Sequence, residues 1–168
     1  MDFRFQSLQD ESEVKSLEHF LRLQSLGYPR YQDWVTRARE ELLSSYKRAI
    51  LAFSEGRIVG DLIPQQHKTF PRVREIKNLR VHPKIRNRYF GAFMLKQAEE
   101  TDKSSYDAII GDIRSDQIEA LNLFKISGYE ELARTSLYED EAKEIIVVKR
   151  FERTPKGFFI PLNNSFHN

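Results

Sequence analysis

The sequence contains no cysteine, and this absence excludes several kinds of chemistry. Without cysteine, the chain can form no disulfides and offers neither thiolate metal ligands nor a cysteine nucleophile. Its four histidines, His19, His67, His82 and His167, are scattered and show no metal-ligand spacing. We therefore expect no bound metal.

Long apolar runs are also missing. No stretch approaches the roughly 20 apolar residues that a membrane-spanning helix needs. The first residues, Met1 to Phe5, lack the basic segment and apolar run of a signal peptide. We therefore expect a soluble, cytoplasmic protein with no membrane partner.

The rest of the composition is ordinary for a globular protein. The chain has 168 residues, of which 40% are hydrophobic and 31% charged, with a net charge of +2. This length predicts one domain, which we place at residues 1–151. The tail, residues 152–168, carries the apolar patch Phe158 to Leu162, which is unusual for a solvated disordered tail. We expect the tail to pack back on the domain, although it could instead cover a substrate groove or form a homodimer contact.

Hydrophobic periodicity, turn residues and capping residues predict the element order β-α-α-β-β-β-α-β-α-β-β. The predicted strands are residues 2–8, 47–54, 57–64, 74–81, 106–113, 129–138 and 143–151, and the helices follow residue 10, span 31–44, begin near 90 and follow 116.

Local signals support these elements. Asp10 with Glu13, and Asp116 with Glu119, have the spacing of helix-capping pairs. The apolar run at residues 106–113 is continuous, which predicts a strand buried on both faces.

The most informative stretch is a strand, a basic turn and an amphipathic helix at residues 75–100. The strand ends at His82-Pro83, because proline donates no ladder hydrogen bond. Arg86 to Gly91 form the turn, and an apolar helix face follows at Phe90, Phe93, Met94 and Ala98. The first amides of a helix are unpaired and its dipole adds positive charge there, so this turn is a candidate anion site.

Cations are concentrated around this strand and turn. The stretch from His67 to Arg88 contains a single acidic residue, Glu75, and eight basic residues: Lys68, Arg72, Arg74, Lys77, Arg80, Lys84, Arg86 and Arg88. They could be long side chains on a solvated strand and loop. Alternatively, they could bind a polyanion, which would be a nucleotide cofactor, RNA or both.

The turn resembles the acetyl-CoA site of the GNAT acetyltransferases, whose pattern is Arg/Gln-x-x-Gly-x-Gly/Ala. Arg86 matches the first position and Gly91 the last, while Tyr89 replaces the middle glycine. The element order over residues 1–151 is also that of the family. The resemblance implies an α/β (α+β) fold in which a mixed, central seven-stranded sheet is flanked by four helices.

The resemblance also implies how acetyl-CoA would bind. Backbone groups of Leu79, Arg80 and Val81 would align the pantetheine arm. The amides of the turn and first helical residues would hold the pyrophosphate, namely those of Arg86, Asn87, Arg88, Tyr89, Phe90, Gly91 and Ala92. Tyr89 lacks the conformational freedom of glycine, so it could narrow the site or change the path of the turn.

Glu75 is the candidate general base. It lies eleven residues before Arg86, the offset of the catalytic glutamate in the histone-type members that the chain resembles. Burial in a cleft would raise the pKa of Glu75 and suit it to this role. A salt bridge to a nearby cation would lower that pKa and make Glu75 a poor base. His82 could titrate near neutral pH or be structural, and Asp112 could bind a cationic substrate group or cap a turn.

Phe124 occupies the position where family members often carry a tyrosine that protonates the leaving CoA thiolate. Phenylalanine has no proton to give, and Tyr129 is expected in the core. We therefore predict slow or acid-independent transfer, and a faster reaction for Phe124→Tyr if protonation is limiting.

Two functions remain open at this point. The first is an acetyl-CoA-dependent N-acetyltransferase acting on an amine of a small molecule, protein or aminoacyl-RNA. The second is a non-catalytic module that senses CoA or contacts nucleic acid through residues 67–88.

Overall fold

The computed structural model describes residues 2–23, 28–137, 143–153 and 159–161. The elements are β1 (Phe3–Ser7), α1 (Glu11–Arg22), α2 (Tyr31–Leu43), β2 (Ile50–Ser54), β3 (Arg57–Gln66), β4 (Val73–Val81), the 3-10 helix η1 (Pro83–Ile85), α3 (Phe90–Glu100), the 3-10 helix η2 (Lys103–Ser105), β5 (Ala108–Arg114), α4 (Ile118–Ile126), β6 (Glu130–Thr135), β7 (Glu144–Arg153) and β8 (Phe159–Pro161). This order confirms the predicted one, with β8 as an additional strand.

The chain forms two compact units, residues 1–64 with 78–94 and residues 65–77 with 95–168. Strand β4 and helix α3 each contribute to both units. In the first unit the strands follow the order β1-β2-β3-β4, and in the second β4-β5-β7-β6, with β8 beside β7. The seven strands of this path and the four α-helices confirm the predicted mixed α/β fold.

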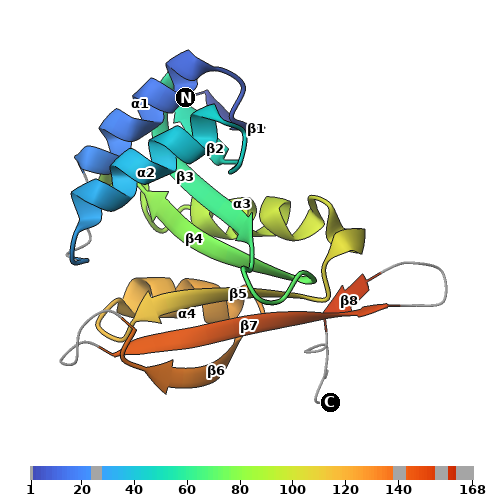
Figure 1. Cartoon of the computed structure of the whole chain (residues 1–168). Helices are drawn as coiled ribbons and strands as arrows, with labels where there is room; N and C mark the ends of the chain where they lie inside the picture. The colour runs from blue at the N-terminus through green and yellow to red at the C-terminus, as the bar shows by residue number, and fades with distance from the viewer. Residues whose placement is uncertain (1, 24–27, 138–142, 154–158, 162–168) are drawn as a thin grey trace. The chain divides into compact units, whose positions relative to one another are not determined.

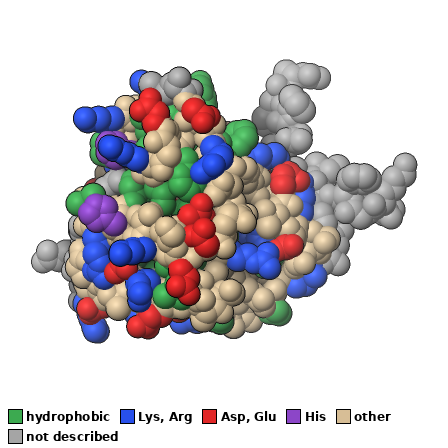
Figure 2. All heavy atoms as spheres, turned by 90° about the horizontal axis from the view of Figure 1, so that it is seen from above, with side chains coloured by type: hydrophobic (Ala, Val, Ile, Leu, Met, Phe, Trp, Pro, Cys, Tyr) green, Lys and Arg blue, Asp and Glu red, His purple; other side chains and the backbone are tan. Residues whose placement is uncertain are grey.

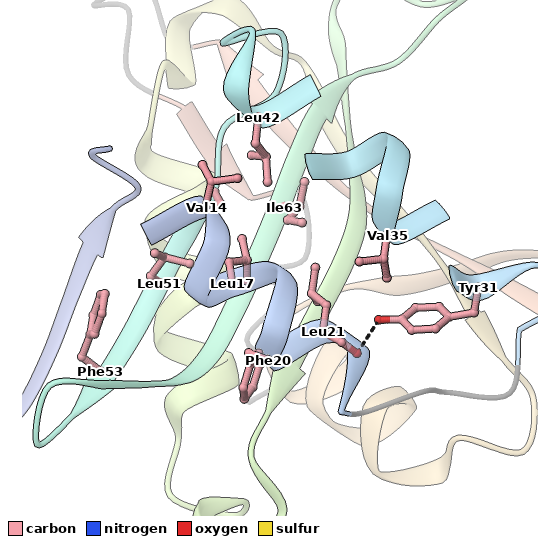
Figure 3. Close-up of a cluster of buried hydrophobic side chains, with 11 residues drawn as sticks. Val14, Leu17, Phe20, Leu21, Tyr31, Val35, Leu42, Leu51, Phe53 and Ile63 are labelled. Atoms are coloured by element: carbon pink, nitrogen blue, oxygen red, sulfur yellow. Dashed lines mark hydrogen bonds between the residues drawn. The ribbon is translucent and has the colours of Figure 1, made fainter. Parts of the chain in front are cut away.

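The first unit is built on an apolar core between helices and strands. Figure 1 shows α1 and α2 lying together over β2 and β3. In Figure 3, Leu17 of α1 and Val35 of α2 point toward Leu51 and Ile63 of the strands. All four side chains are fully buried. Burying one such side chain contributes about 1.5–3 kcal/mol, so this cluster is a main source of the unit's stability.

The start of α1 confirms its predicted capping pair. The Asp10 carboxylate accepts a hydrogen bond from the Glu13 amide at 2.9 Å. Glu13 in turn accepts one from the Gln9 amide at 2.8 Å. Two helix-terminal amides are thereby satisfied, as in a capping box.

The second capping prediction is wrong. Helix α4 begins after Gln117, whose side chain makes no cap hydrogen bond. Asp116 instead pairs with Arg114 at 2.8 Å. Both Asp116 oxygens accept hydrogen bonds from the Arg114 guanidinium, at 3.2 and 2.8 Å, so the carboxylate is engaged in a bidentate pair instead of a helix cap.

The prediction that residues 106–113 are buried on both faces is also wrong. Along β5 the side chains alternate between buried and half-buried. Ile109 and Ile113 are buried, whereas Ile110 is half-buried. Strand β5 pairs in parallel with β4 and antiparallel with β7, so the ladder is mixed rather than all-parallel. Mixed and antiparallel sheets commonly leave one face less covered.

The ends of the last strands are only partly described. The predicted hairpin turn at Glu139 to Glu141 lies outside the described residues. In the tail, β8 pairs antiparallel with β7, with Pro161 opposite Phe151. Most of residues 152–168 lies outside the described part, so the role of the tail stays a prediction.

Candidate functional site

The basic turn is fixed to the strands of the first unit by backbone groups. The His82 amide donates to the Val59 carbonyl of β3 at 2.7 Å, directly after β4 ends. The turn then passes through η1, and the Arg86 guanidinium Nε donates back to the Val81 carbonyl at 3.2 Å. The structure therefore gives Arg86 a positioning contact at the end of β4 in addition to its charge.

Two residues of the turn have left-handed backbones. The φ angle is 60° at Asn87 and 63° at Tyr89. Asparagine tolerates this region, but a bulky residue there is an outlier. The turn thus adopts at Tyr89 a conformation that glycine would adopt without strain. The Tyr89 side chain is 79% exposed, so burial of its ring does not compensate for that strain.

The first turn of α3 is held by aromatic packing. The buried Phe90 ring meets the Phe3 ring edge-on at 4.8 Å between centroids and the Phe5 ring at 5.3 Å. Phe93 also contacts Phe5 at 4.6 Å, yet it is 52% exposed, so it lies at the edge of the predicted apolar face. The backbone amides at this helix start lack intrahelical partners by geometry.

These residues fit a polyanionic group such as the pyrophosphate of CoA. Lys84, Arg86 and Arg88 are all exposed around the turn. Left-handed backbones within a turn help to orient successive amides toward an anion. Gly91, the last position of the turn pattern, is buried near the start of α3.

Strand β4 presents two different faces. Its even-numbered residues are buried from Arg74 to Arg80, and its odd-numbered residues are half-buried from Val73 to Val81. The candidate base Glu75 and the residues Leu79 and Val81 therefore share one face, because strand side chains alternate. The Arg80 side chain points to the opposite face, so only its backbone remains available for the predicted cofactor role.

Arg80 belongs to a buried polar cluster in the first unit. Its guanidinium lies over the Tyr31 ring at 4.6 Å and donates to the Asn78 side-chain oxygen at 3.1 Å and the Leu21 carbonyl at 3.3 Å. The Tyr31 hydroxyl donates to the same Leu21 carbonyl at 2.9 Å, as the dashed line in Figure 3 marks. Burial raises the pKa of Tyr31 to about 12, so the hydroxyl keeps its proton.

Asp61 of β3 completes this cluster and was not singled out from the sequence. It is fully buried and accepts a hydrogen bond from the Asn78 amide. Its second oxygen, Oδ1, has no hydrogen-bond partner among the described residues. Burial raises the pKa of Asp61 from 3.8 to about 6, although Arg80 and Asn78 act in the opposite direction. The sequence signal that could have identified Asp61 as a buried carboxylate is its position within the apolar run from Ile58 to Ile63.

Glu75 lies in a paired arrangement in the second unit. Lys77 donates to one carboxylate oxygen at 2.8 Å and the Gln65 amide to the other at 3.0 Å. Burial acts to raise the pKa of Glu75, but Lys77, Gln65 and His67 together outweigh it, so the pKa is lowered. This is the salt-bridged alternative considered from the sequence. It weakens Glu75 as a proton acceptor while the pair is intact.

The basic stretch of residues 67–88 does not form one exposed patch. Arg74 is buried and donates to the Ala98 and Thr101 carbonyls at the end of α3. Arg72 pairs with Asp107 at 2.7 Å. Lys77, Arg80 and Arg86 also make intramolecular contacts, so at least five of the eight cations are engaged within the chain. Figure 2 shows acidic and basic side chains interspersed on the face of the molecule that it presents.

Phe124 is a core residue of the second unit. It is 4% exposed and meets the Tyr129 ring edge-on at 4.9 Å. A Cβ atom added to Gly111 of β5 would lie 3.4 Å from the Phe124 ring, so the ring covers this glycine. Tyr129 is buried as predicted, and burial raises the pKa of its hydroxyl well above its ordinary value.

The two remaining candidates have modest environments. His82 is half-buried, and its Nδ1 accepts a hydrogen bond from the Lys84 amide at 3.3 Å at the start of η1. This contact favours the structural role. Asp112 is half-buried on β5, opposite Ile146 of β7.

Within the described part of the chain no cluster of histidine, aspartate and glutamate side chains could hold a metal ion. No described helix is long and apolar enough to cross a membrane.

The fold is similar to that of several solved acetyltransferases. An acetyltransferase of the GNAT family from Streptococcus pneumoniae superposes with a TM-score of 0.69 at 15% identity, covering 89% of this chain and 99% of that one. A ribosomal-protein alanine N-acetyltransferase from Escherichia coli gives 0.70 at 14% identity, covering 95% and 100%. The NatC complex bound to Gag peptide and CoA gives 0.69 at 14% identity, covering 88% and 98%.

At these identities the structural likeness establishes the fold alone. No curated protein matches the sequence. The profile of the acetyltransferase (GNAT) family, however, matches residues 10–129, which include the strand, the turn and the start of α3. Because this match spans most of the 168 residues, the chain belongs to the acetyltransferase (GNAT) family.

Proposed function

We propose that the protein is an acetyl-CoA-dependent N-acetyltransferase whose acceptor is an amine. The observation that carries the proposal is the turn from His82 to Tyr89, which joins β4 to α3 within the region matched by the family profile. Its exposed cations and helix-terminal amides suit the pyrophosphate of CoA. The NatC structure contains CoA and a peptide, which supports the same class of cosubstrate.

The residues divide the work of transfer between backbone and side chains. The amides from Asn87 to Ala92 would hold the pyrophosphate, and backbone groups from Leu79 to Val81 would align the pantetheine arm. The Arg86 amide already donates to the Pro83 carbonyl at 3.4 Å, so Arg86 would contribute mainly its charge. Alignment alone lowers the barrier, because it turns an encounter into an intramolecular step. When bound, acetyl-CoA supplies the activated acetyl group.

Proton transfer has little support from side chains. Glu75 can accept the amine proton only after its bond to Lys77 is released. Phe124 offers no proton to the thiolate, which leaves unassisted or takes a proton from water. This is chemically acceptable, because a thiol pKa of about 8.5 makes thiolate a fair leaving group near neutral pH.

A charge reversal in the turn tests the proposal. Acetyl-CoA should raise the melting temperature of the native protein by mass action. Arg86→Glu should lose most of this shift, because it places a carboxylate beside the pyrophosphate. Arg37→Glu, which reverses an exposed arginine on α2, is the matched control and should keep it. Equal shifts in both variants would remove the turn from the site.

The second candidate is a CoA-binding module that does not transfer acetyl groups. The paired Glu75 and the hydroxyl-free Phe124 favour it. Consumption of the thioester with a panel of amines, including peptide N-termini and aminoacyl-RNA, separates the two. Binding without consumption for every amine would favour the module. Binding to RNA through residues 67–88 would show steep salt dependence.

A further inference from the structure

A buried polar cluster in the first unit joins two helices to two strands. Arg80 of β4 donates to the Leu21 carbonyl at the end of α1 at 3.3 Å, and its guanidinium lies 4.6 Å from the centre of the Tyr31 ring at the start of α2. Arg80 also donates through Nε to the Asn78 side-chain oxygen at 3.1 Å, and the nitrogen of the same amide donates to Asp61 of β3. Asp61 and Arg80 therefore flank a single side-chain amide.

The two ends of this cluster are unequally satisfied. The Leu21 carbonyl accepts hydrogen bonds from both Arg80 and the Tyr31 hydroxyl, the latter at 2.9 Å (Figure 3). By contrast, Asp61 is fully buried, and its Oδ1 atom has no hydrogen-bond partner among the described residues. A buried acceptor without a donor is unfavourable, and more so when it is charged. Moving Arg80 from Leu21 to Asp61 would satisfy Oδ1 and still leave Leu21 with one donor.

Asp61 is the member of the cluster whose charge changes near neutral pH. Arg80 is the cation that acts on Asp61, and β2 places an apolar residue opposite it. Tyr31 of α2 has a pKa raised by burial to about 12, so it stays neutral. Arg22 of α1 acts on Tyr31, and Tyr28 acts on Arg80. Arginine and tyrosine side chains ordinarily titrate at about 10 or above.

We propose that Arg80 is a switch that exchanges partners when Asp61 loses its proton. With Asp61 protonated, Arg80 holds the Leu21 carbonyl and lies over the Tyr31 ring, which ties the end of α1 to the start of α2. When the carboxyl proton passes to solvent, the ionised Oδ1 atom attracts the guanidinium, and the contacts to Leu21 and Tyr31 lengthen. All of these residues belong to the first unit.

The cost of burying the ionised carboxylate drives the exchange. In the arrangement described above, burial raises the pKa of Asp61 from 3.8 to about 6. By linkage, an arrangement that restored the ordinary pKa would be favoured about 100-fold more with Asp61 ionised than with Asp61 protonated. A shift of that size turns a preference of about 10:1 into about 1:10.

Trp34 of α2 is placed to report this exchange. It is the single tryptophan of the chain. Its ring stacks on the Tyr31 ring, with 5.8 Å between centroids and 24° between planes. Because Arg80 lies over that same Tyr31 ring, withdrawal of the guanidinium changes the surroundings of Trp34 and therefore its fluorescence.

The test titrates the full chain from about pH 4 to about 7 while Trp34 fluorescence and far-UV circular dichroism are recorded. We expect a one-proton change in fluorescence with a midpoint between 3.8 and about 6, at constant circular dichroism. Asp61→Asn has the same shape but is neutral at every pH, so it should abolish the change. His19→Gln, which removes an exposed titratable side chain of α1, is the matched control and should keep it.

NMR of the native protein adds a measurement that needs no variant. The Asp61 carboxyl carbon and the Arg80 Nε–H group should titrate with one shared midpoint. The switch is wrong if the Arg80 resonance stays constant while Asp61 titrates, or if the fluorescence change persists in Asp61→Asn or disappears in His19→Gln. Loss of circular dichroism in parallel with the fluorescence would likewise replace it with global unfolding. Neither measurement uses acetyl-CoA, so the outcome is separate from that of the proposed function.

Discussion

Tyr89 stores backbone strain in the candidate CoA turn. Its φ of 63° lies in the left-handed region, which costs an L-residue roughly 1–2 kcal/mol. Because its side chain is 79% exposed, removing the ring forfeits little buried area. Replacing Tyr89 therefore isolates the effect of backbone conformation.

Tyr89→Gly should stabilise the protein. Glycine adopts this conformation freely, but it costs about 0.5–1 kcal/mol in unfolded-state entropy. The net gain in the free energy of unfolding is therefore about 0.5–1 kcal/mol, which corresponds to a rise of roughly 1–4 °C in Tm for a chain of this size.

Tyr89→Ala is the matched control. It removes the same ring but keeps a Cβ atom, so the strain remains. In urea unfolding, the free energy of unfolding of the glycine variant should exceed that of the alanine variant by about 0.5–1 kcal/mol at unchanged m value. Equal stability of the two variants would refute the assignment of strain to this residue.

The glycine variant also tests the link between this turn and the ligand. Its backbone already fits the left-handed conformation, so acetyl-CoA should bind at least as tightly to Tyr89→Gly as to the native protein. Calorimetric titration measures the affinity. A clear loss of affinity would show that the tyrosine ring itself contacts the ligand.

Three further predictions concern the two units. The folded pKa of Asp61, about 6, lies above its ordinary 3.8, so the folded state binds this proton more tightly. The stabilisation that comes from protonating Asp61 in the folded state is present below pH 3.8 and is lost as the pH rises to about 6. The free energy of unfolding should therefore fall across that window by up to about 3 kcal/mol. Asp61→Asn should abolish this pH dependence in denaturation measured from pH 4 to 7. Gly60→Ala should cost about 1–3 kcal/mol in urea unfolding, because the new Cβ would lie 3.0 Å from the Arg80 carbonyl oxygen; Gly111→Ala, with its nearest contact at 3.4 Å, should cost less. Phe124→Tyr should raise the turnover rate if protonation of the leaving thiolate is rate-limiting. The variant should also lose about 1–3 kcal/mol of stability where the buried hydroxyl finds no hydrogen-bond partner. If the native enzyme is fast and the variant is no faster, the missing acid does not limit the reaction.

The sequence predicted the elements well because their signals are local. Alternation, helical spacing and the Asp10–Glu13 pair each act within a few residues, and these gave the order of strands and helices. The capping prediction at Asp116 failed because both of its carboxylate oxygens pair with Arg114, and the spacing of a capping pair takes no account of such a neighbour. The uneven burial of β5 depends on which strands flank it, and that information is not local.

The part of the candidate site that is formed by backbone groups was predictable from the sequence. The turn, its helix and Arg86 were found from their order and spacing. The pairing of the charged side chains was not predictable, because each side chain points to one face of β4 and the sequence alone does not say which face is buried. Glu75 could be drawn as a base or as a salt bridge from the sequence, and Lys77 at 2.8 Å gives the ion pair. Asp61 and Tyr31 meet Arg80 only after α1, α2 and the strands pack.

Alternation along β4 explains why counting charges overstated the basic surface. Arg74, Asn78 and Arg80 are all on the buried face, where each polar group must find a partner. The carbonyls at the end of α3 satisfy Arg74, and the Leu21 carbonyl with Asn78 satisfies Arg80. These arginines therefore stabilise helix ends within their own units and are not available to phosphate. On the other face, Lys77 is bound to Glu75. An anion approaching this part of the chain would meet the exposed cations of the turn first, which is why the turn is the stronger candidate for the polyanion site.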